Sequence, residues 1–136
     1  MAETVLHHAN QVETAWEGAY KESLITEAWE QAAYLTAVVG ARFVAAGVGL
    51  AEARTVRRWV EEGTAPREHD VAARLALLFR VTKAVADVYT PAVAAAFLRS
   101  ANPQLDDESP LLVLREGDPE IAGKHLLAAA RAFLEG

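Results

Sequence analysis

In the second half of the chain, an oxygen-bearing side chain directly precedes a proline at three places: Thr90-Pro91, Ser109-Pro110 and Asp118-Pro119. Such a side chain accepts a hydrogen bond from a free backbone N–H at the start of a helix, and the proline after it has no N–H to lose and a φ that already suits a helix. Each pair therefore predicts a helix start. The three predicted helices are PAVAAAFLRSA, which stops near Asn102-Pro103, PLLVLRE, which Gly117 ends as a C′ residue, and PEIAGKHLLAAARAFLE.

Apolar residues recur at spacings of three and four along the rest of the chain, and no stretch alternates at period two. These spacings predict a helix from about residue 69 to 89, another from about 50 to 62 that Gly63 ends, and one or two helices from about 24 to 46 with a break at Gly40. A further helix is expected within residues 1–20, with Trp16 and Tyr20 as anchors. The fold class is therefore all-α. The expected apolar stripe of the last helix consists of Ile121, His125, Leu126, Ala129, Ala130 and Phe133.

The bulk composition indicates an intracellular protein. The chain has 136 residues and no cysteine, so it forms neither disulfides nor thiolate metal sites. The longest apolar stretch is interrupted by Arg42 and by glycines, which excludes a membrane span, and the first residues lack the pattern of a signal peptide. We expect a soluble, cytoplasmic protein that does not bind membranes.

Positive charge gathers in the middle of an acidic chain. The net charge is −6, yet residues 41–88 carry eight basic and six acidic side chains. Within that segment the stretch RTVRRWVEEG places Arg54, Arg57 and Arg58 close together. A basic patch on an otherwise acidic protein indicates a specific anionic partner.

On a helix, Val56 and Trp59 share a face, while the three arginines and Thr55 lie on the outer side. A short helix, ARFVAAGV, and a glycine-containing turn precede this segment, which is the pattern of a helix-turn-helix. The predicted DNA contacts are therefore Arg54, Thr55, Arg57 and Arg58, because the arginine fork pairs with a guanine edge or a phosphate. The alternative is a solvated helix in which Glu61 and Glu62 neutralise the arginines as i,i+4 partners.

At these residues the sequence resembles the helix-turn-helix of Xre/MbcA/ParS-type antitoxins, in which the string R-(S/T)-V-x-R-W-x-x-G is common. The matching residues are Arg54, Thr55, Val56, Arg58, Trp59 and Gly63, with one extra residue before the glycine. The second half resembles the toxin-binding domain of the same family in the order of its punctuating residues. These are Phe97-Leu98, Asn102-Pro103, Leu105, Ser109-Pro110, Leu111 to Leu114, Gly117, and Ile121 to Phe133. The chain departs from the family at Phe97, where tryptophan is frequent, and in the turn Asp106-Asp107-Glu108, where glycine is frequent.

The resemblance implies an all-α antitoxin of a type II toxin–antitoxin system, built as a helix-turn-helix bundle followed by a small three-helix segment. Its divisions would be an N-terminal extension (1–24), an Xre-like helix-turn-helix domain (25–89) and a toxin-binding domain (90–136). It implies a toxin partner with a RES fold that consumes NAD, whose active site the antitoxin covers, and repression of the protein's own promoter. The toxin contacts would be the C-terminal residues Arg131, Phe133, Leu134, Glu135 and Gly136, unless that end simply frays.

Two other interpretations remain open. One is a helix-turn-helix regulator whose C-terminal half only dimerises, and the other is an interaction module whose helix-turn-helix no longer binds DNA. A homodimer is expected for any operator-binding form, because one helix-turn-helix reads only a half-site. We expect no enzyme and no cofactor, because His7 and His8 lie in a start expected to be disordered, no histidine pair has zinc spacing, and no phosphate loop is present.

Overall fold

The structure is a computed structural model that describes residues 2–136. Within these residues it contains eight α-helices, a short 3₁₀ helix and no strand, which confirms the all-α prediction. The helices are α1 (Ala2–Ile25), α2 (Ala28–Val39), α3 (Ala41–Val48), α4 (Ala53–Glu62), α5 (His69–Val88), α6 (Pro91–Arg99), α7 (Pro110–Glu116) and α8 (Pro119–Glu135), with η1 (Pro103–Leu105) between α6 and α7.

The three helix starts predicted from a capping residue and a proline are confirmed. The Thr90 side chain accepts a hydrogen bond from the Val93 N–H at 3.1 Å, and the Ser109 hydroxyl accepts one from the Leu112 N–H at 3.3 Å. The Asp118 carboxylate accepts from two N–H groups of the first turn of α8. Local side-chain chemistry therefore sets where α6, α7 and α8 begin.

Other boundaries shift by a few residues. Gly40, with φ 90°, separates α2 from α3 as expected, and Gly63, with φ 64°, ends α4 in the left-handed conformation. The predicted helix from residue 50 begins only at Ala53, because Gly49 is left-handed and opens a turn. The helix that was expected to stop near Asn102-Pro103 ends at Arg99.

Gly117 ends α7 for a different reason from the one predicted. Its backbone is extended (φ −88°), so it is not a left-handed C′ residue. A Cβ atom at this position would lie 2.8 Å from the Ala122 Cβ. The glycine is therefore needed because α7 and α8 approach closely.

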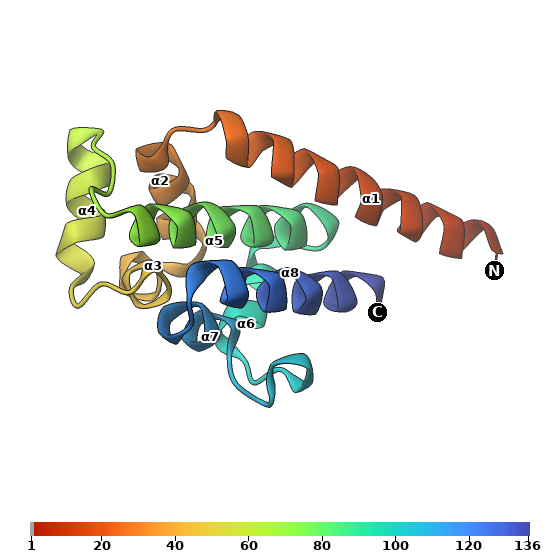
Figure 1. Cartoon of the computed structure of the whole chain (residues 1–136). Helices are drawn as coiled ribbons and strands as arrows, with labels where there is room; N and C mark the ends of the chain where they lie inside the picture. Colours follow the sequence, from red (N-terminus) through yellow and green to blue (C-terminus); the bar gives the residue numbers. More distant parts are fainter. Residues whose placement is uncertain (1) are drawn as a thin grey trace.

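The core is continuous along the chain and gathers around α5. Leu75, Leu78, Val81 and Val85 of α5 are fully buried, and side chains from α1 to α4 and α6 to α8 join the same cluster. Residues of all three predicted divisions thus share one core. Figure 1 shows α4 at one end of α5 and the start of α1 and end of α8 at the other. We call these the α4 end and the distal end.

The first residues are helical, which corrects the expectation of a disordered start at His7 and His8. α1 runs from Ala2 to Ile25 and packs along α5 through Val12 and Ala19, which are buried. Trp16 is partly buried, and the Arg80 guanidinium carbon lies 5.5 Å from its ring centroid and 4.7 Å from that of Tyr20. These contacts fix α1 to the body of the protein.

Candidate nucleic-acid interface and distal partner surface

The helix α4, which follows the turn after α3, has one face buried against the core and one face exposed to solvent. Val56 and Trp59 are buried beneath it, as the helical spacing predicted, and Val60 is partly buried beside them. The Arg115 guanidinium from α7 donates hydrogen bonds of 3.0 Å to the carbonyls of Ala46 and Leu50, at the end of α3 and in the turn. The turn is thus held by a residue 65 positions away in the sequence.

The outer face of α4 carries the arginines that the sequence assigned to DNA. Arg54, Arg57 and Arg58 are exposed, and Thr55 is partly buried. Arg54 forms an ion pair with Glu52 at 3.3 Å. Arg57 and Arg58 form no ion pair or side-chain hydrogen bond with any residue in 2–136, so the alternative pairing with Glu61 and Glu62 is not seen. These two guanidiniums are available for an anion.

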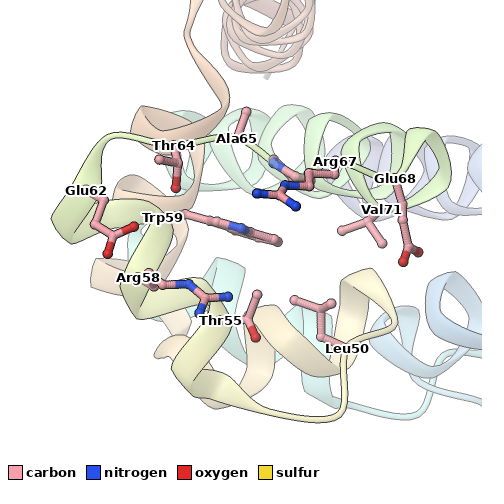
Figure 2. Close-up of a pocket in the computed structure, with 11 residues that line it drawn as sticks. Leu50, Thr55, Arg58, Trp59, Glu62, Thr64, Ala65, Arg67, Glu68 and Val71 are labelled. Atoms are coloured by element: carbon pink, nitrogen blue, oxygen red, sulfur yellow. The ribbon is translucent and has the colours of Figure 1, made fainter.

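A groove of about 710 Å³ lies between α4, the loop after it and the start of α5. Figure 2 shows the Trp59 ring across this groove, with Arg58 and Thr55 on the α4 side and Arg67 on the loop side. Glu62 and Glu68 also line it, so its two cations are balanced by two carboxylates. The groove places Arg67 next to the outer face of α4, but because its charges balance it is no strong anion site by itself.

Arg67 is a candidate contact that the sequence interpretation missed. It lies in the loop that follows α4 and is exposed. Because Arg67 lies four residues after Gly63, beyond the end of the predicted helix, helical spacing could not predict where its side chain would lie. Its proximity to α4 emerges only from the fold.

The predicted toxin-binding residues lie at the distal end, where the structure separates their roles. Leu134 is fully buried in the core, so its side chain is not available to a partner in this conformation, contrary to the expectation. Phe133 is 38% exposed, and Glu135 and Gly136 are exposed. Phe133 is therefore accessible at the surface, whereas its neighbour Leu134 packs in the core.

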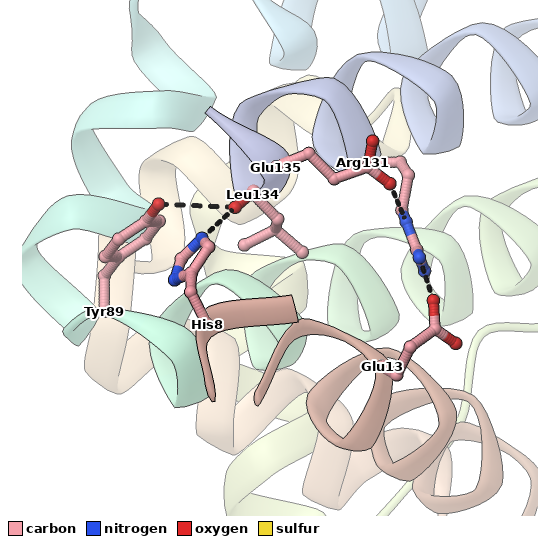
Figure 3. Close-up of polar contacts among 6 residues, drawn as sticks. All are labelled: His8, Glu13, Tyr89, Arg131, Leu134 and Glu135. Atoms are coloured by element: carbon pink, nitrogen blue, oxygen red, sulfur yellow. Dashed lines mark hydrogen bonds and ion pairs between the residues drawn. The ribbon is translucent and has the colours of Figure 1, made fainter. Parts of the chain in front are cut away.

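Arg131 is engaged within the molecule. Its guanidinium donates to Glu135 at 2.5 Å and to Glu13 of α1, as Figure 3 shows. It also lies over the ring of Trp16, with 5.4 Å between the guanidinium carbon and the ring centroid. Arg131 therefore connects α8 to α1, and Glu135 pairs with it from within α8. A toxin that used either residue would first have to displace these contacts.

One carbonyl group near the end of α8, that of Leu134, also has partners outside the helix. The Leu134 carbonyl lies 2.7 Å from His8 Nε2 and accepts a longer hydrogen bond, 3.4 Å, from the Tyr89 hydroxyl. The Tyr89 ring packs edge-on against Phe133, with centroids 5.8 Å apart, and Phe133 packs against Phe97 at 4.9 Å. The end of α8 thus makes contacts with α1, with Tyr89 directly after α5, and with α6.

The resolved pKa shifts occur away from the α4 face, where α1 and α2 pack on α5. Burial raises the pKa of Tyr34 and lowers the pKa of Arg80. Burial alone would lower the pKa of Lys83, but the hydrogen bond and charge of Asp87, together with the charges of Glu22 and Tyr34, raise it, and the net shift is upward. These shifts report the packing of α1 and α2 on α5.

Within residues 2–136, no group of three or more His, Cys, Asp or Glu side chains is arranged to hold a metal ion. None of the helices in the described chain combines the length and the apolar character that crossing a bilayer requires. In comparisons with known proteins, no family model, no curated protein and no solved structure matches this chain.

Proposed function

We propose that this protein is the antitoxin of a type II toxin–antitoxin pair. In this proposal the protein is a homodimer, and α4 of each subunit binds operator DNA in the protein's own promoter. The distal end binds a toxin, a RES-type protein that consumes NAD, and covers its active site. The observation that carries the DNA-binding part is the outer face of α4, where Arg57 and Arg58 are exposed and unpaired within residues 2–136.

The chemistry of that face suits a nucleic acid. Two adjacent guanidiniums on an exposed helix can pair with guanine edges or hold phosphates, and the buried Val56 and Trp59 keep the helix in a fixed orientation. The partly buried Thr55 beside them can donate a hydrogen bond from its hydroxyl group to a phosphate oxygen. The acidic remainder of the chain limits non-specific attraction to other surfaces.

The test is binding of the promoter fragment that lies upstream of this reading frame, measured by fluorescence anisotropy. The Arg57→Ala/Arg58→Ala variant is expected to lose roughly a hundredfold in affinity, and the slope of log K against log salt should fall by about two. The matched control is Lys21→Ala/Lys124→Ala, which removes the same charge from two exposed lysines outside α4. Equal affinities of the two variants would remove α4 from the DNA interface.

The toxin is tested by expressing the neighbouring reading frame with and without this chain. Growth arrest by the neighbour alone, relieved by this chain through a stable complex, is the expected result. The arginine variant of α4 should still relieve the arrest, because α4 and the distal end lie at opposite ends of α5.

The second candidate is a helix-turn-helix regulator without a toxin, whose C-terminal half has no partner beyond a second copy. One observation favours it: Leu114, Leu126 and Leu134 of the C-terminal helices are fully buried in the same core as α3 and α5. That half therefore has a structural use of its own. Promoter binding with no toxic neighbour and no complex would support this candidate.

A further inference from the structure

The start of α1 carries apolar side chains that no other part of the described chain covers. Val5 and Leu6 are 69% and 63% exposed. Val5 lies seven residues before Val12, which is buried against α5, so it continues the α5-facing side of the helix. Leu6 lies seven residues before Glu13, which pairs with Arg131 of α8, so it continues the α8-facing side.

Both packing sides of α1 therefore run past the ends of the helices that they pack against. Figure 1 shows the start of α1 extending beyond the C-terminal end of α8. Residues 2–11 of α1 are mostly exposed, and a ten-residue helix of this kind buries too little surface to be stable on its own in water. This segment is held by the contact of His8 with the end of α8 and by the anchoring of α1 further along the chain.

Exposed aromatic rings continue the apolar surface on the body of the protein. Tyr89 and Phe133 are both more than a third exposed, and their rings are in edge-on contact. His8 joins them to α1, since its ring centroid lies 6.2 Å from that of Tyr89 and Val5 lies one turn before it on the same side. We call the surface formed by Val5, Leu6, Tyr89 and Phe133 the distal patch.

The distal patch is held in place before any partner arrives. His8 Nε2 lies within hydrogen-bond distance of the Leu134 carbonyl, and Arg131 pairs with Glu13 across α1 and α8. Figure 3 shows these two contacts on either side of the buried Leu134 side chain. A surface that is already ordered loses little conformational entropy on binding.

The charges around the patch select the class of partner. Glu3 lies beside it, and Glu13 and Glu135 together exceed the single charge of Arg131 between them. An acidic rim repels phosphates, so this end suits a protein with basic residues around an apolar depression rather than a nucleic acid.

Charge disfavours a second copy as the occupant. In a two-fold dimer the same patch of each copy faces the other, so the acidic rim of one copy would lie against the acidic rim of its partner.

We infer that the distal patch is the docking surface for the toxin and that the projecting turns of α1 are part of it. This inference rests on the proposed function and assigns a role to the N-terminal residues, which the family resemblance does not cover. The toxin surface it requires is an apolar depression with a basic rim.

The experiment compares two neutral double variants in titrations of the full chain against the purified product of the neighbouring reading frame. Val5→Gln/Leu6→Gln removes apolar surface from the patch. Leu24→Gln/Ile25→Gln is the matched control, because these residues are 66% and 83% exposed at the other end of the same helix. The first variant should bind roughly tenfold more weakly or worse, and the second within about twofold of the unmodified chain.

Each outcome is decisive. Unchanged affinity of the Val5/Leu6 variant, with tight binding by the unmodified chain, would overturn the inference while leaving the proposed function intact. No complex with the unmodified chain would contradict the toxin part of the proposed function and the inference with it. Sedimentation of each chain alone covers the remaining case: a dimer that only the Val5/Leu6 variant loses would make the occupant a second copy and overturn the inference.

Discussion

The two ends of α5 use arginine in opposite ways. At the α4 end, Arg57 and Arg58 are exposed and make no ion pair within the described residues. At the distal end, Arg131 is held by two carboxylates and lies over Trp16. The arginines of both ends count equally as basic residues in the sequence, but Arg57 and Arg58 at the α4 end have exposed guanidiniums without an ion pair in residues 2–136, whereas Arg131 is paired. The pairing state of each guanidinium, rather than the number of arginines, therefore distinguishes a binding face from a structural contact.

The same distinction applies to apolar side chains at the distal end, and it gives the largest expected effect. Leu134→Ala should lower the free energy of unfolding by about 2–5 kcal/mol, because it leaves a cavity in the shared core. Phe133→Ala, one residue earlier on the exposed side, should lower it by only about 1–2 kcal/mol. Urea denaturation measures both. Equal losses of unfolding free energy would mean that Phe133 contributes as much to the core as Leu134, contrary to the difference in their burial.

The next effect contrasts one arginine from each end. Arg131→Ala should destabilise the protein by about 1–2 kcal/mol, since it removes two ion pairs and the contact with Trp16. Arg57→Ala should change the stability by less than about 0.5 kcal/mol. Thermal unfolding at low and high salt checks this, with the Arg131 effect expected to shrink as salt screens the ion pairs. A larger loss for Arg57 would break the comparison.

The smallest effect sharpens the comparison within α4. Arg54 is paired with Glu52, unlike its two neighbours. Glu52→Gln should free this guanidinium and remove a charge that repels phosphate, raising promoter affinity by about two- to fivefold with no change in stability. Anisotropy titrations at low salt measure the gain. A loss of affinity would show that Glu52 positions Arg54 for DNA rather than competing for it.

Local chemistry made much of the fold predictable. The starts of α6, α7 and α8 followed from Thr90, Ser109 and Asp118, because the capping residue and its proline lie next to the N–H groups that they affect. The outer and inner faces of α4 followed from helical spacing, because Val56 and Trp59 are large and apolar while their neighbours are charged. Signals of this kind need no knowledge of distant contacts.

The inner face of α8 was predicted only in part. Leu126, Ala129 and Ala130 are buried as expected, whereas Ile121, His125 and Phe133 of the expected stripe are exposed. Ala122 and Gly123 are buried in their place. A Cβ on Gly123 would meet Leu77 of α5 at 2.8 Å, so this face is chosen by close approach. Small residues carry little hydrophobic signal in a sequence, so the predicted stripe included the larger Ile121 and Phe133 instead.

Side-chain contacts between segments far apart in the chain could not be predicted from the sequence. His8 and Leu134 are 126 positions apart, and nothing in either segment indicates the other. Arg74 donates to the carbonyls of Leu114 and Gly117 at the end of α7, and no helical pattern predicts such a pair. For the candidate site, sequence identified the arginines of α4, but their freedom from ion pairs required the folded structure.

The span of the contact between His8 and Leu134 also bears on the order in which the molecule assembles. α3 and α4 are consecutive, so they can form their contacts while most of the chain is still unfolded, whereas α1 and α8 must close a loop of nearly the whole chain. During synthesis α1 is made before α8, so the start of α1 can be fixed only after α8 has been made. We therefore expect a newly made chain to complete its α4 end before its distal end.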